Sequence, residues 1–255
     1  GMMSKAFEDH FQRVAPHYLK HRPSYPAALF DWLAQCCSQH QLAWDCGTGN
    51  GQAAVSLAQH FQHVLATDAS AAQIAAATAH GRVEYRLAAA QASGLAPASV
   101  DLLVVAQALH WFDLERFYAE ARRVLKPGGI IAVWCYGTVE LEGEAANLLL
   151  QHFYHQVVGP YWPAEREHVA TGYRQLPFPF SPIDAPPFPM RANWTREQLL
   201  GYLRSWSATG HYQAAQGADP VLAFEQTLST AWPDAKQPRQ VRWPLSVRVG
   251  RASGS

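Results

Sequence analysis

The amino-acid sequence predicts an α/β protein with a doubly wound, mostly parallel sheet. Between residues 42 and 136, short apolar runs alternate with helical patterns, which is typical of consecutive βαβ units. A glycine-rich turn at residues 47–51 follows the first apolar run, and Asp68 ends the second. A turn and an acidic residue in these places are typical of open α/β sheets that bind a nucleotide-like ligand at the carboxyl ends of their strands.

The expected core consists of strands that alternate with helices. The run at residues 100–106 is apolar along nearly its whole length, so it is expected in the centre of the sheet, buried on both faces. The last helix of the core is expected to end at residues 126–129, because Pro127 cannot continue a helix and the glycines after it tolerate a left-handed turn. The strands are predicted over residues 42–45, 63–68, 83–86, 100–106 and 130–134, and the helices over 53–60, 71–79 and 114–125.

The segments on either side of this core are expected to belong to the same domain, which spans residues 1–255. Residues 5–41 have a mostly helical pattern that two prolines interrupt at residues 22–26. Residues 137–238 are expected to form a cap over the core. Residues 239–250 alternate between apolar and polar side chains like a terminal strand.

The cap itself shows three distinct patterns. A helix is predicted over residues 143–158, and the proline-rich residues 159–189 predict a rigid, irregular connection that forms part of a lid. Thr195 and Gln198 have the spacing of a capping box, which predicts the start of a helix that runs to Trp206.

Composition excludes several classes of partner. Lys and Arg together number 20, as do Asp and Glu, so the charge gives no reason to expect a nucleic acid or a membrane surface as partner. The four cysteines lack paired spacing, and the histidines lack the spacing of metal ligands, so neither a metal nor a disulfide is expected. With no membrane-spanning stretch and no signal sequence, we expect a soluble cytoplasmic monomer or homodimer that acts on a small molecule.

The glycine-rich turn predicts a cofactor site. Gly47, Gly49 and Gly51 are positions where the backbone can approach a ligand closely, because glycine lacks a side chain and tolerates positive φ. Asp68 lies about 20 residues further on, where a carboxylate accepts hydrogen bonds from ribose hydroxyls. Both a nicotinamide dinucleotide and S-adenosylmethionine are compatible with these features.

Two residues favour S-adenosylmethionine over a dinucleotide. Gln52 occupies the position at which a dinucleotide-binding G-x-G-x-x-G turn has its third glycine. Asp45, just before the turn, would repel a pyrophosphate, whereas its charge suits the ammonium group of a methionine moiety.

With these motifs the sequence resembles the class I S-adenosylmethionine-dependent methyltransferases, and within them the small-molecule group that is similar to trans-aconitate methyltransferase. The resemblance covers residues 5–136 and rests on residues 45–51, 67–70, 106–112 and 123–129, with further matches at Tyr18, 22–26 and 205–208.

The resemblance implies a seven-stranded sheet with S-adenosyl-L-methionine bound across the carboxyl ends of the first, second and fourth strands. Members of the family commonly have an acidic residue after the third strand, where this chain has residues 89–91, Ala-Ala-Gln. Adenine recognition is therefore expected to use backbone groups or Gln91. The cofactor-binding residues that the resemblance implies are Tyr18, Asp45, Gly47, Thr48, Gly49, Gly51, Asp68, Ala69, Ala90, Gln91 and Gln107.

The methyl acceptor is expected to be a small organic molecule, and a carboxylate is one option. A carboxylate is already ionised near neutral pH and needs only orientation, for which Arg22 is the first candidate and Arg204 the second. A hydroxyl, amine or carbon acid needs a general base, and His110 is the candidate because it follows the fourth strand. The expected substrate-binding residues are Arg22, Tyr25, His110, Trp111, Arg204 and Trp206.

Two other functions remain open at this point. The first is a non-catalytic S-adenosylmethionine sensor or assembly subunit that keeps the cofactor turn without turnover. The second is a nicotinamide-dependent oxidoreductase, against which Gln52 and Asp45 argue. An enclosed acceptor pocket beside the cofactor turn would favour an enzyme over a sensor.

Overall fold

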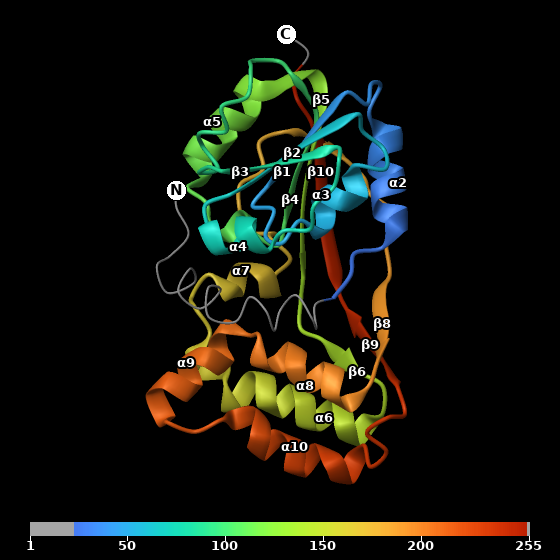
Figure 1. The fold of residues 1–255 in the computed structure, drawn as a ribbon, viewed down its shortest axis with the longest axis vertical. Helices are drawn as coiled ribbons and strands as arrows, with labels where there is room; N and C mark the ends of the chain where they lie inside the picture. Colours follow the sequence, from blue (N-terminus) through green and yellow to red (C-terminus); the bar gives the residue numbers. More distant parts are fainter. Residues whose placement is uncertain (1–22, 254–255) are drawn as a thin grey trace.

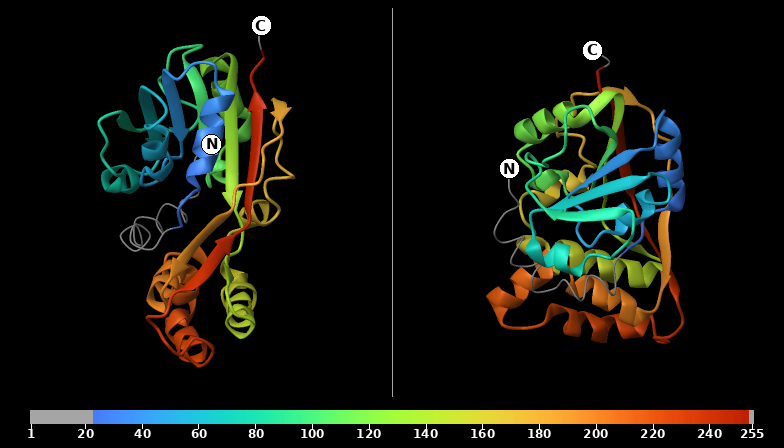
Figure 2. Two further views of the ribbon diagram at one scale, coloured as in Figure 1. Left: turned by 90° about the vertical axis from the view of Figure 1, so that its right-hand side faces the viewer. Right: turned by 45° about the horizontal axis from the view of Figure 1, so that its top comes forward.

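The computed structural model describes residues 23–253, which form two lobes connected by strands (Figures 1 and 2). The larger lobe contains a seven-stranded sheet in the order β3-β2-β1-β4-β5-β10-β7. Strands β1 to β5 run parallel, whereas β10 runs antiparallel to both of its neighbours. The prediction of a doubly wound, mostly parallel seven-stranded sheet is confirmed. The strands are β1 (Leu42–Cys46), β2 (His63–Asp68), β3 (Val83–Leu87), β4 (Val100–Ala106), β5 (Leu125–Tyr136), β7 (Ser181–Ile183) and β10 (Leu245–Arg251).

Helices cover both faces of this sheet. Successive side chains of a strand point to opposite faces, so Ala43 packs with the helices on one side and Trp44 with Phe117 on the other. All three side chains are fully buried, and burial of a large apolar side chain stabilises a fold by about 1.5–3 kcal/mol. Helices α2 (Ala27–Cys36) and α3 (Gln52–Leu57) pack in the first cluster and α5 (Leu114–Val124) in the second, while α4 (Ala71–Ala76) lies against β2 and β3.

The order of the strands places the ligand site. The chain proceeds outward from β1 to β2 and β3, and then returns to the other side of β1 as β4. Ligands of open α/β sheets bind outside the carboxyl ends of the strands at such a reversal. The glycine-rich loop after β1, Asp68 at the end of β2 and the residues after β4 meet there.

The smaller lobe is the cap. A three-stranded antiparallel sheet of β6 (Glu140–Leu141), β9 (Arg239–Trp243) and β8 (Met190–Trp194) connects it to the larger lobe. Aromatic side chains fill its core, where Phe153 lies 6.0 Å from Trp206 and 4.9 Å from Phe224 between ring centroids. Its helices are α6 (Glu144–His152), continued by a π-helical turn η2 (Phe153–Val157), α8 (Arg196–Arg204), α9 (Ser207–Gln216) and α10 (Pro220–Ala231).

The predicted capping box at the start of α8 is confirmed. The backbone N–H of Gln198 donates to the Thr195 hydroxyl at 3.3 Å, and the backbone N–H of Thr195 donates to the Gln198 side chain at 2.8 Å. None of the helices in residues 23–253 is long and apolar enough to cross a bilayer.

The terminal strand differs from its prediction. Residues 239–250 form two strands in different sheets: β9 belongs to the cap, and β10 pairs with β5 in the main sheet. Pro244 separates them, because it has no backbone N–H with which to continue the ladder. The polarity pattern continues across the proline, so alternation alone could not show the change of sheet.

The proline-rich residues 159–189 are more regular than predicted. They contain a short 3-10 turn η3 (Gly159–Tyr161), helix α7 (Arg166–Ala170) and strand β7. Pro182 is tolerated in β7 because this strand lies at the edge of the sheet.

The boundary after α5 also shifts. The helix ends at Val124, and β5 begins at Leu125, which pairs with Val100. The next pair is Leu102 with Ile130, so the proline and glycine residues 126–129 bulge out of the ladder. These residues therefore end the helix as predicted but do not separate it from the strand.

Candidate functional site

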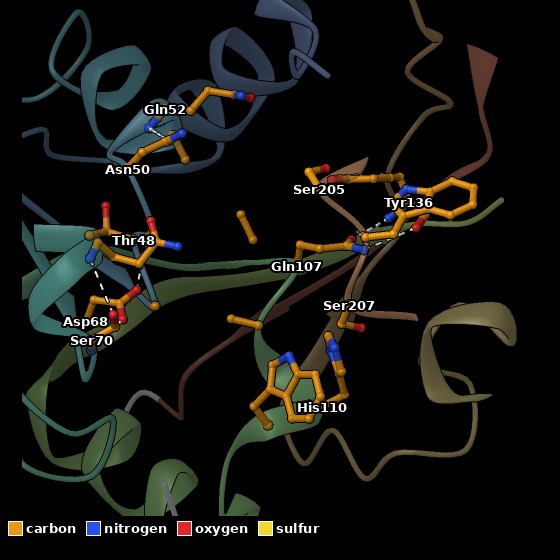
Figure 3. Close-up of a pocket in the computed structure, with 18 of the residues that line it drawn as sticks. Thr48, Asn50, Gln52, Asp68, Ser70, Gln107, His110, Tyr136, Ser205 and Ser207 are labelled. Carbon is orange, nitrogen blue, oxygen red and sulfur yellow. Dashed lines mark hydrogen bonds between the residues drawn. The ribbon is translucent and has the colours of Figure 1, made fainter. Parts of the chain in front are cut away.

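A cavity opens at the carboxyl ends of β1, β2 and β4 and extends to the cap (Figure 3). Its volume is about 1230 Å³, including the part that is open to solvent. The main sheet contributes the glycine-rich loop, the end of β2 and the residues after β4. The cap contributes Trp162, Pro163, Tyr202 and residues 205–207, helix α7 contributes Arg166, and Tyr25 and Tyr136 complete the wall.

The glycine-rich loop has the backbone geometry that the sequence predicted. Gly47, Gly49 and Gly51 have φ values of 76°, 59° and 88°, in the left-handed region that favours glycine. The backbone N–H groups of Gly47 and Thr48 donate to the Thr67 carbonyl at 2.9 and 2.8 Å, which ties the loop to β2. A Cβ on Gly49 would have only one neighbouring atom within 4 Å, at 3.9 Å, so the cavity reaches this backbone.

Asp68 lies at the edge of the cavity with both carboxylate oxygens engaged. Oδ2 accepts from the backbone N–H of Gly49 at 2.8 Å, and Oδ1 accepts from the backbone N–H of Ser70 at 2.9 Å. Because each carboxylate oxygen has two lone pairs, Asp68 can still accept from a pair of ribose hydroxyls. The residue therefore holds the loop and faces the ligand at the same time.

Asp45 does not line the cavity, and its predicted contact with the cofactor is not reproduced. Its side chain is fully buried, and Oδ2 accepts from the Thr48 hydroxyl at 2.7 Å. Burial raises the pKa of Asp45 to about 7, and the charge of Asp68 adds to this effect. Because the side chain points inward from β1, it supports the loop from behind.

The raised pKa of Asp45 gives a testable pH dependence. The folded protein holds this proton up to about pH 7, whereas the ordinary pKa is 3.8. Since the folded state binds the proton more tightly, the contribution of Asp45 to stability is complete below pH 3.8 and is lost as the pH rises through 7. The free energy of unfolding of the wild type minus that of Asp45→Asn should fall by about 2 kcal/mol between pH 5 and pH 7.

Urea unfolding of both proteins at each pH measures this difference. Using the difference cancels the other titrating groups, including His110, whose depressed pKa acts in the opposite direction. A difference that does not change with pH would show that Asp45 is ionised throughout.

A second, smaller pocket adjoins the cavity and shares Gly47 and Asp68 with it. Its remaining lining is almost entirely apolar and suits a flat ring such as adenine: Cys46, Ala69, Ala88, Ala90 and Phe112. The predicted cofactor-binding residues Ala69 and Ala90 both line this pocket. Gln91 does not line either pocket, although its Oε1 is buried without a hydrogen-bond partner among the described residues.

The residues present fit S-adenosylmethionine. Besides Asp68 and the apolar pocket, Asn50 lines the cavity with a buried Nδ2 that has no acceptor in residues 23–253. Such a donor needs a partner, and a ligand carboxylate would provide one. Gly51 does not line the cavity, and its positive φ serves the turn into α3.

Gln107, directly after β4, is held in a strained conformation at the cavity. Its φ of 58° is unusual for a residue with a side chain, and such outliers often occur at functional sites. Its Oε1 accepts from the backbone N–H of Tyr136 at 2.7 Å, which fixes the side chain between β4 and β5.

His110 lies on the cavity wall in the 3-10 turn η1 (Leu109–Trp111), but its environment disfavours the role of a general base. Its Nδ1 lies 2.9 Å from the hydroxyl of Tyr173. Burial lowers the pKa of His110 to about 3, and the charges of Arg166 and His168 add to this effect. A base whose pKa is so far below neutrality has little driving force for proton abstraction.

Among the described residues, the arginine that lines the cavity is Arg166 and not the predicted Arg204. Arg204 forms an ion pair with Asp219 at 3.5 Å and does not line the cavity, because its position on α8 points it toward the start of α10. Arg22 lies outside the described residues, as does Tyr18. Arg166 of α7 lines the cavity instead. Sequence reasoning missed Arg166 because no pattern in the proline-rich segment distinguishes it from other surface arginines.

The other predicted substrate-binding residues meet at the cavity from three parts of the chain. Tyr25 precedes α2, Trp111 belongs to η1, and Trp206 lies between α8 and α9. Ser205 and Ser207 flank Trp206 and line the same wall, as Figure 3 shows.

Comparisons with known proteins agree with this geometry. The sequence model of the methyltransferase domain family matches residues 44–133. A relative from Dictyostelium discoideum that is named as a methyltransferase is 32% identical over 229 residues, which cover 89% of this chain and 87% of the relative.

Solved structures support the same assignment. A protein named as a type II methyltransferase, from Anaeromyxobacter dehalogenans, is 43% identical and superposes with a TM-score of 0.85, covering 92% of this chain and 99% of that one. The cyclase SpnF, 16% identical with a TM-score of 0.54, shares the fold alone, covering 100% of this chain and 98% of that one. A nicotinamide-dependent oxidoreductase is therefore excluded, and the chain belongs to the class I methyltransferases, enzymes whose cofactor is S-adenosylmethionine.

Proposed function

We propose that the protein methylates the carboxylate of a small organic acid, held in the cavity between the glycine-rich loop and the cap. The position of Arg166 carries this proposal. Its cationic side chain lines the same cavity as the loop that fits the cofactor. The acceptor expected from the sequence, one like trans-aconitate, belongs to this class.

The contacts of Arg166 leave its charge available to a ligand. Its Nε donates to the Tyr154 hydroxyl at 2.8 Å, and its guanidinium carbon lies 4.9 Å from the centroid of the Trp162 ring. It takes part in none of the salt bridges among the described residues. An arginine that is oriented through Nε presents its terminal nitrogens to a planar anion, and a carboxylate can accept from them in bidentate fashion.

The rest of the acceptor region suits an organic body. Aromatic rings line it from both lobes, and the hydroxyls of Ser205 and Ser207 provide a few polar groups. Ligand sites of this kind bury the apolar part of a small molecule and orient it by a few polar contacts. This composition supports a small-molecule acceptor over a protein or nucleic acid.

A carboxylate acceptor fits a site that has no strong base. Bound S-adenosylmethionine supplies an electrophilic methyl group: the carboxylate oxygen bonds to the methyl carbon, the carbon–sulfur bond breaks with its electron pair left on sulfur, and no proton moves. Arg166 orients and neutralises the carboxylate. The apolar part of the lining lowers the local dielectric constant, which strengthens that interaction.

The cavity also supports an enzyme over a non-catalytic sensor. A sensor that had lost turnover would be expected to fill the space beside the cofactor loop. In this protein the space continues from the loop to Arg166 and Trp206.

We further infer that the protein acts in the cytoplasm, alone or as a homodimer, without nucleic acid or membrane as partner. Its four cysteines are free, which is typical of proteins in a reducing compartment. Its formal net charge of zero offers no attraction to polyanions.

The test of the proposed function is a panel of acceptors incubated with the enzyme and S-adenosylmethionine. Small mono-, di- and tricarboxylic acids are compared with their amides and alcohols, and S-adenosylhomocysteine and methyl esters are detected by mass spectrometry. We expect esters from one or more acids. Methylation of amines or alcohols with none of the acids would overturn the proposal.

Arg166→Lys is expected to raise KM for the acid by about 30-fold, because lysine keeps the charge but loses the bidentate geometry. Arg204→Lys is the matched control, since Arg204 lies outside the cavity, and its KM should stay within about twofold of wild type. Calorimetry should show unchanged binding of S-adenosylmethionine in both variants. Equal effects of the two substitutions would refute the role of Arg166.

A further inference from the structure

The geometry points to Tyr173 as a positioning residue: its hydroxyl donates to His110 Nδ1, so that His110 keeps its proton on Nε2 and presents an N–H donor to the methyl acceptor. This inference deepens the proposed function and rests on it for the identity of the acceptor. His110 thereby becomes a donor that orients an acceptor oxygen.

The first observation is the conformation of Tyr173. Tyr173 comes shortly after α7. Its φ is 64° and that of the preceding Gly172 is 65°, so two successive residues are in the left-handed region. A left-handed conformation is costly for an aromatic residue, and it persists only where the surroundings enforce it. Arg248 Nη1 donates to the Tyr173 carbonyl at 2.8 Å and to the Leu176 carbonyl at 2.9 Å, which holds this segment. The strained backbone places the fully buried Tyr173 hydroxyl beside His110.

The second observation is the direction of the hydrogen bond between Tyr173 and His110. Burial holds the pKa of Tyr173 well above its ordinary value, so the phenol keeps its proton. The Tyr173 side chain is fully buried, so its hydroxyl proton needs an acceptor within the protein. Among the described residues, the acceptor within hydrogen-bonding distance of the Tyr173 hydroxyl is His110 Nδ1, at 2.9 Å. The phenol proton therefore points to Nδ1, which must be the unprotonated nitrogen.

The third observation is that the Nε2 atom of His110 is left to bond with a ligand. No hydrogen bond to this nitrogen occurs among the described residues, and the ring lines the cavity. In Figure 3 the His110 side chain points toward Ser207 of the cap. Since a neutral imidazole has one donor and one acceptor, a hydrogen bond accepted at Nδ1 makes Nε2 the donor. His110 and Arg166, which both line the cavity, then offer donors to one anionic group.

Burial and, to a smaller extent, the surrounding charges lower the pKa of His110 and keep it neutral. Arg166 and His168, both on α7, lie near enough to lower its pKa, and Tyr173 is an uncharged neighbour. A neutral Nε2–H donor is therefore present throughout the range in which a small carboxylic acid is ionised. A hydroxyl or amine acceptor would need a base that this arrangement does not provide.

Nuclear magnetic resonance of the protein labelled with ¹⁵N-histidine tests the tautomer without any acceptor. Long-range ¹H–¹⁵N correlations distinguish a protonated Nε2 from a protonated Nδ1. We expect the His110 ring to be the Nε2–H tautomer from pH 6 to pH 8, and this preference to be lost in Tyr173→Phe. A protonated Nδ1 in the wild type would overturn the inference.

Tyr118→Phe is the matched control, because Tyr118 is also a buried tyrosine whose hydroxyl donates, to the Pro177 carbonyl at 2.6 Å, and it does not line the cavity. This variant should leave the His110 signals unchanged. A change of equal size in both variants would mean that loss of any buried hydroxyl disturbs the site.

Kinetics with an accepted acid then separates a donor from a base. Tyr173→Phe should raise KM about tenfold, the change expected for one lost hydrogen bond, with kcat changed less. His110→Gln, which keeps an N–H donor, should retain most of the activity that His110→Ala loses. Equal inactivation by both substitutions, together with a rate that falls as pH decreases below 7, would show a base. If no acid is a substrate but the tautomer is as expected, the proposed function fails and the role of Tyr173 stands.

Discussion

Replacing Asp68 with alanine is expected to weaken the binding of S-adenosylmethionine by about 100-fold or more. The substitution removes the acceptor for the ribose hydroxyls, and hydrogen bonds to a charged group contribute about 1.5–3 kcal/mol each. It also leaves the backbone N–H groups of Gly49 and Ser70 without their carboxylate partner, so the loop loses its orientation. Titration calorimetry with S-adenosylmethionine and with S-adenosylhomocysteine measures the change.

Asp113→Ala separates this effect from general destabilisation. Asp113 is the N-cap of α5, where its side chain accepts from the backbone N–H of Arg116 at 3.4 Å, far along the chain from the cofactor loop. Loss of a cap costs about 1 kcal/mol of stability. We expect this variant to melt at a lower temperature and to bind the cofactor normally. Normal binding by Asp68→Ala would refute the assignment of the ribose site.

Replacing Gly47 with alanine is expected to destabilise the protein by about 2–4 kcal/mol and to abolish measurable cofactor binding. Its φ of 76° costs a residue with a Cβ about 1–2 kcal/mol. The new Cβ would also lie 2.7 Å from the Ala108 Cβ and 3.3 Å from Phe112, and overpacking of this kind typically costs about 1–3 kcal/mol. The Ala108 Cβ is fixed to its backbone and cannot rotate away, so the loop itself must move.

Urea unfolding and calorimetry measure the two effects of Gly47→Ala. Gly81→Ala is the matched control, because a Cβ there has no neighbour within 4 Å and its φ is not positive. Its stability should stay within about 0.5 kcal/mol of wild type. Adding Ala108→Gly to Gly47→Ala should restore part of the lost stability by removing the shortest contact. No restoration would mean that the backbone conformation alone accounts for the loss.

Local sequence determined the elements of the core and the cofactor loop. Apolar runs of strand length, helix-forming segments and glycine or proline stops follow from the immediate neighbours of each residue, so their order along residues 42–136 could be predicted. The loop glycines and Asp68 were predictable for the same reason, because spacing along one βαβ unit sets their separation in space.

The fold nevertheless differs from the sequence expectation where pairing partners decide the outcome. Residues 239–250 alternate continuously, but β9 pairs with β8 and β6 while β10 pairs with β5. Alternation reports that a segment is extended and half-buried, and it does not report which strand lies beside it. Strand β7 was not predicted for a related reason. Its Pro182 favoured an irregular segment, but a proline is excluded only from the paired interior of a sheet, and β7 lies at the edge.

The acceptor side of the site was decided by tertiary structure. Asp45 carries a charge in the right motif, but the direction of its side chain from β1 buries it behind the loop. Arg204 was a reasonable anion ligand until the packing of α8 against α10 paired it with Asp219. Both predictions failed because a residue type indicates which chemistry is available and not the direction in which the side chain points.

The sequence by itself therefore determined the fold class, the family and the glycine-rich loop with Asp68 beside it, because these depend on short-range spacing. Only the tertiary structure placed Arg166 and Tyr173 near His110. His110 comes directly after β4, whereas Arg166 and Tyr173 come several elements later, after β5. Their contacts join residues that are far apart in the chain. Such contacts depend on how the cap and α7 pack against the sheet, and no local pattern encodes that packing.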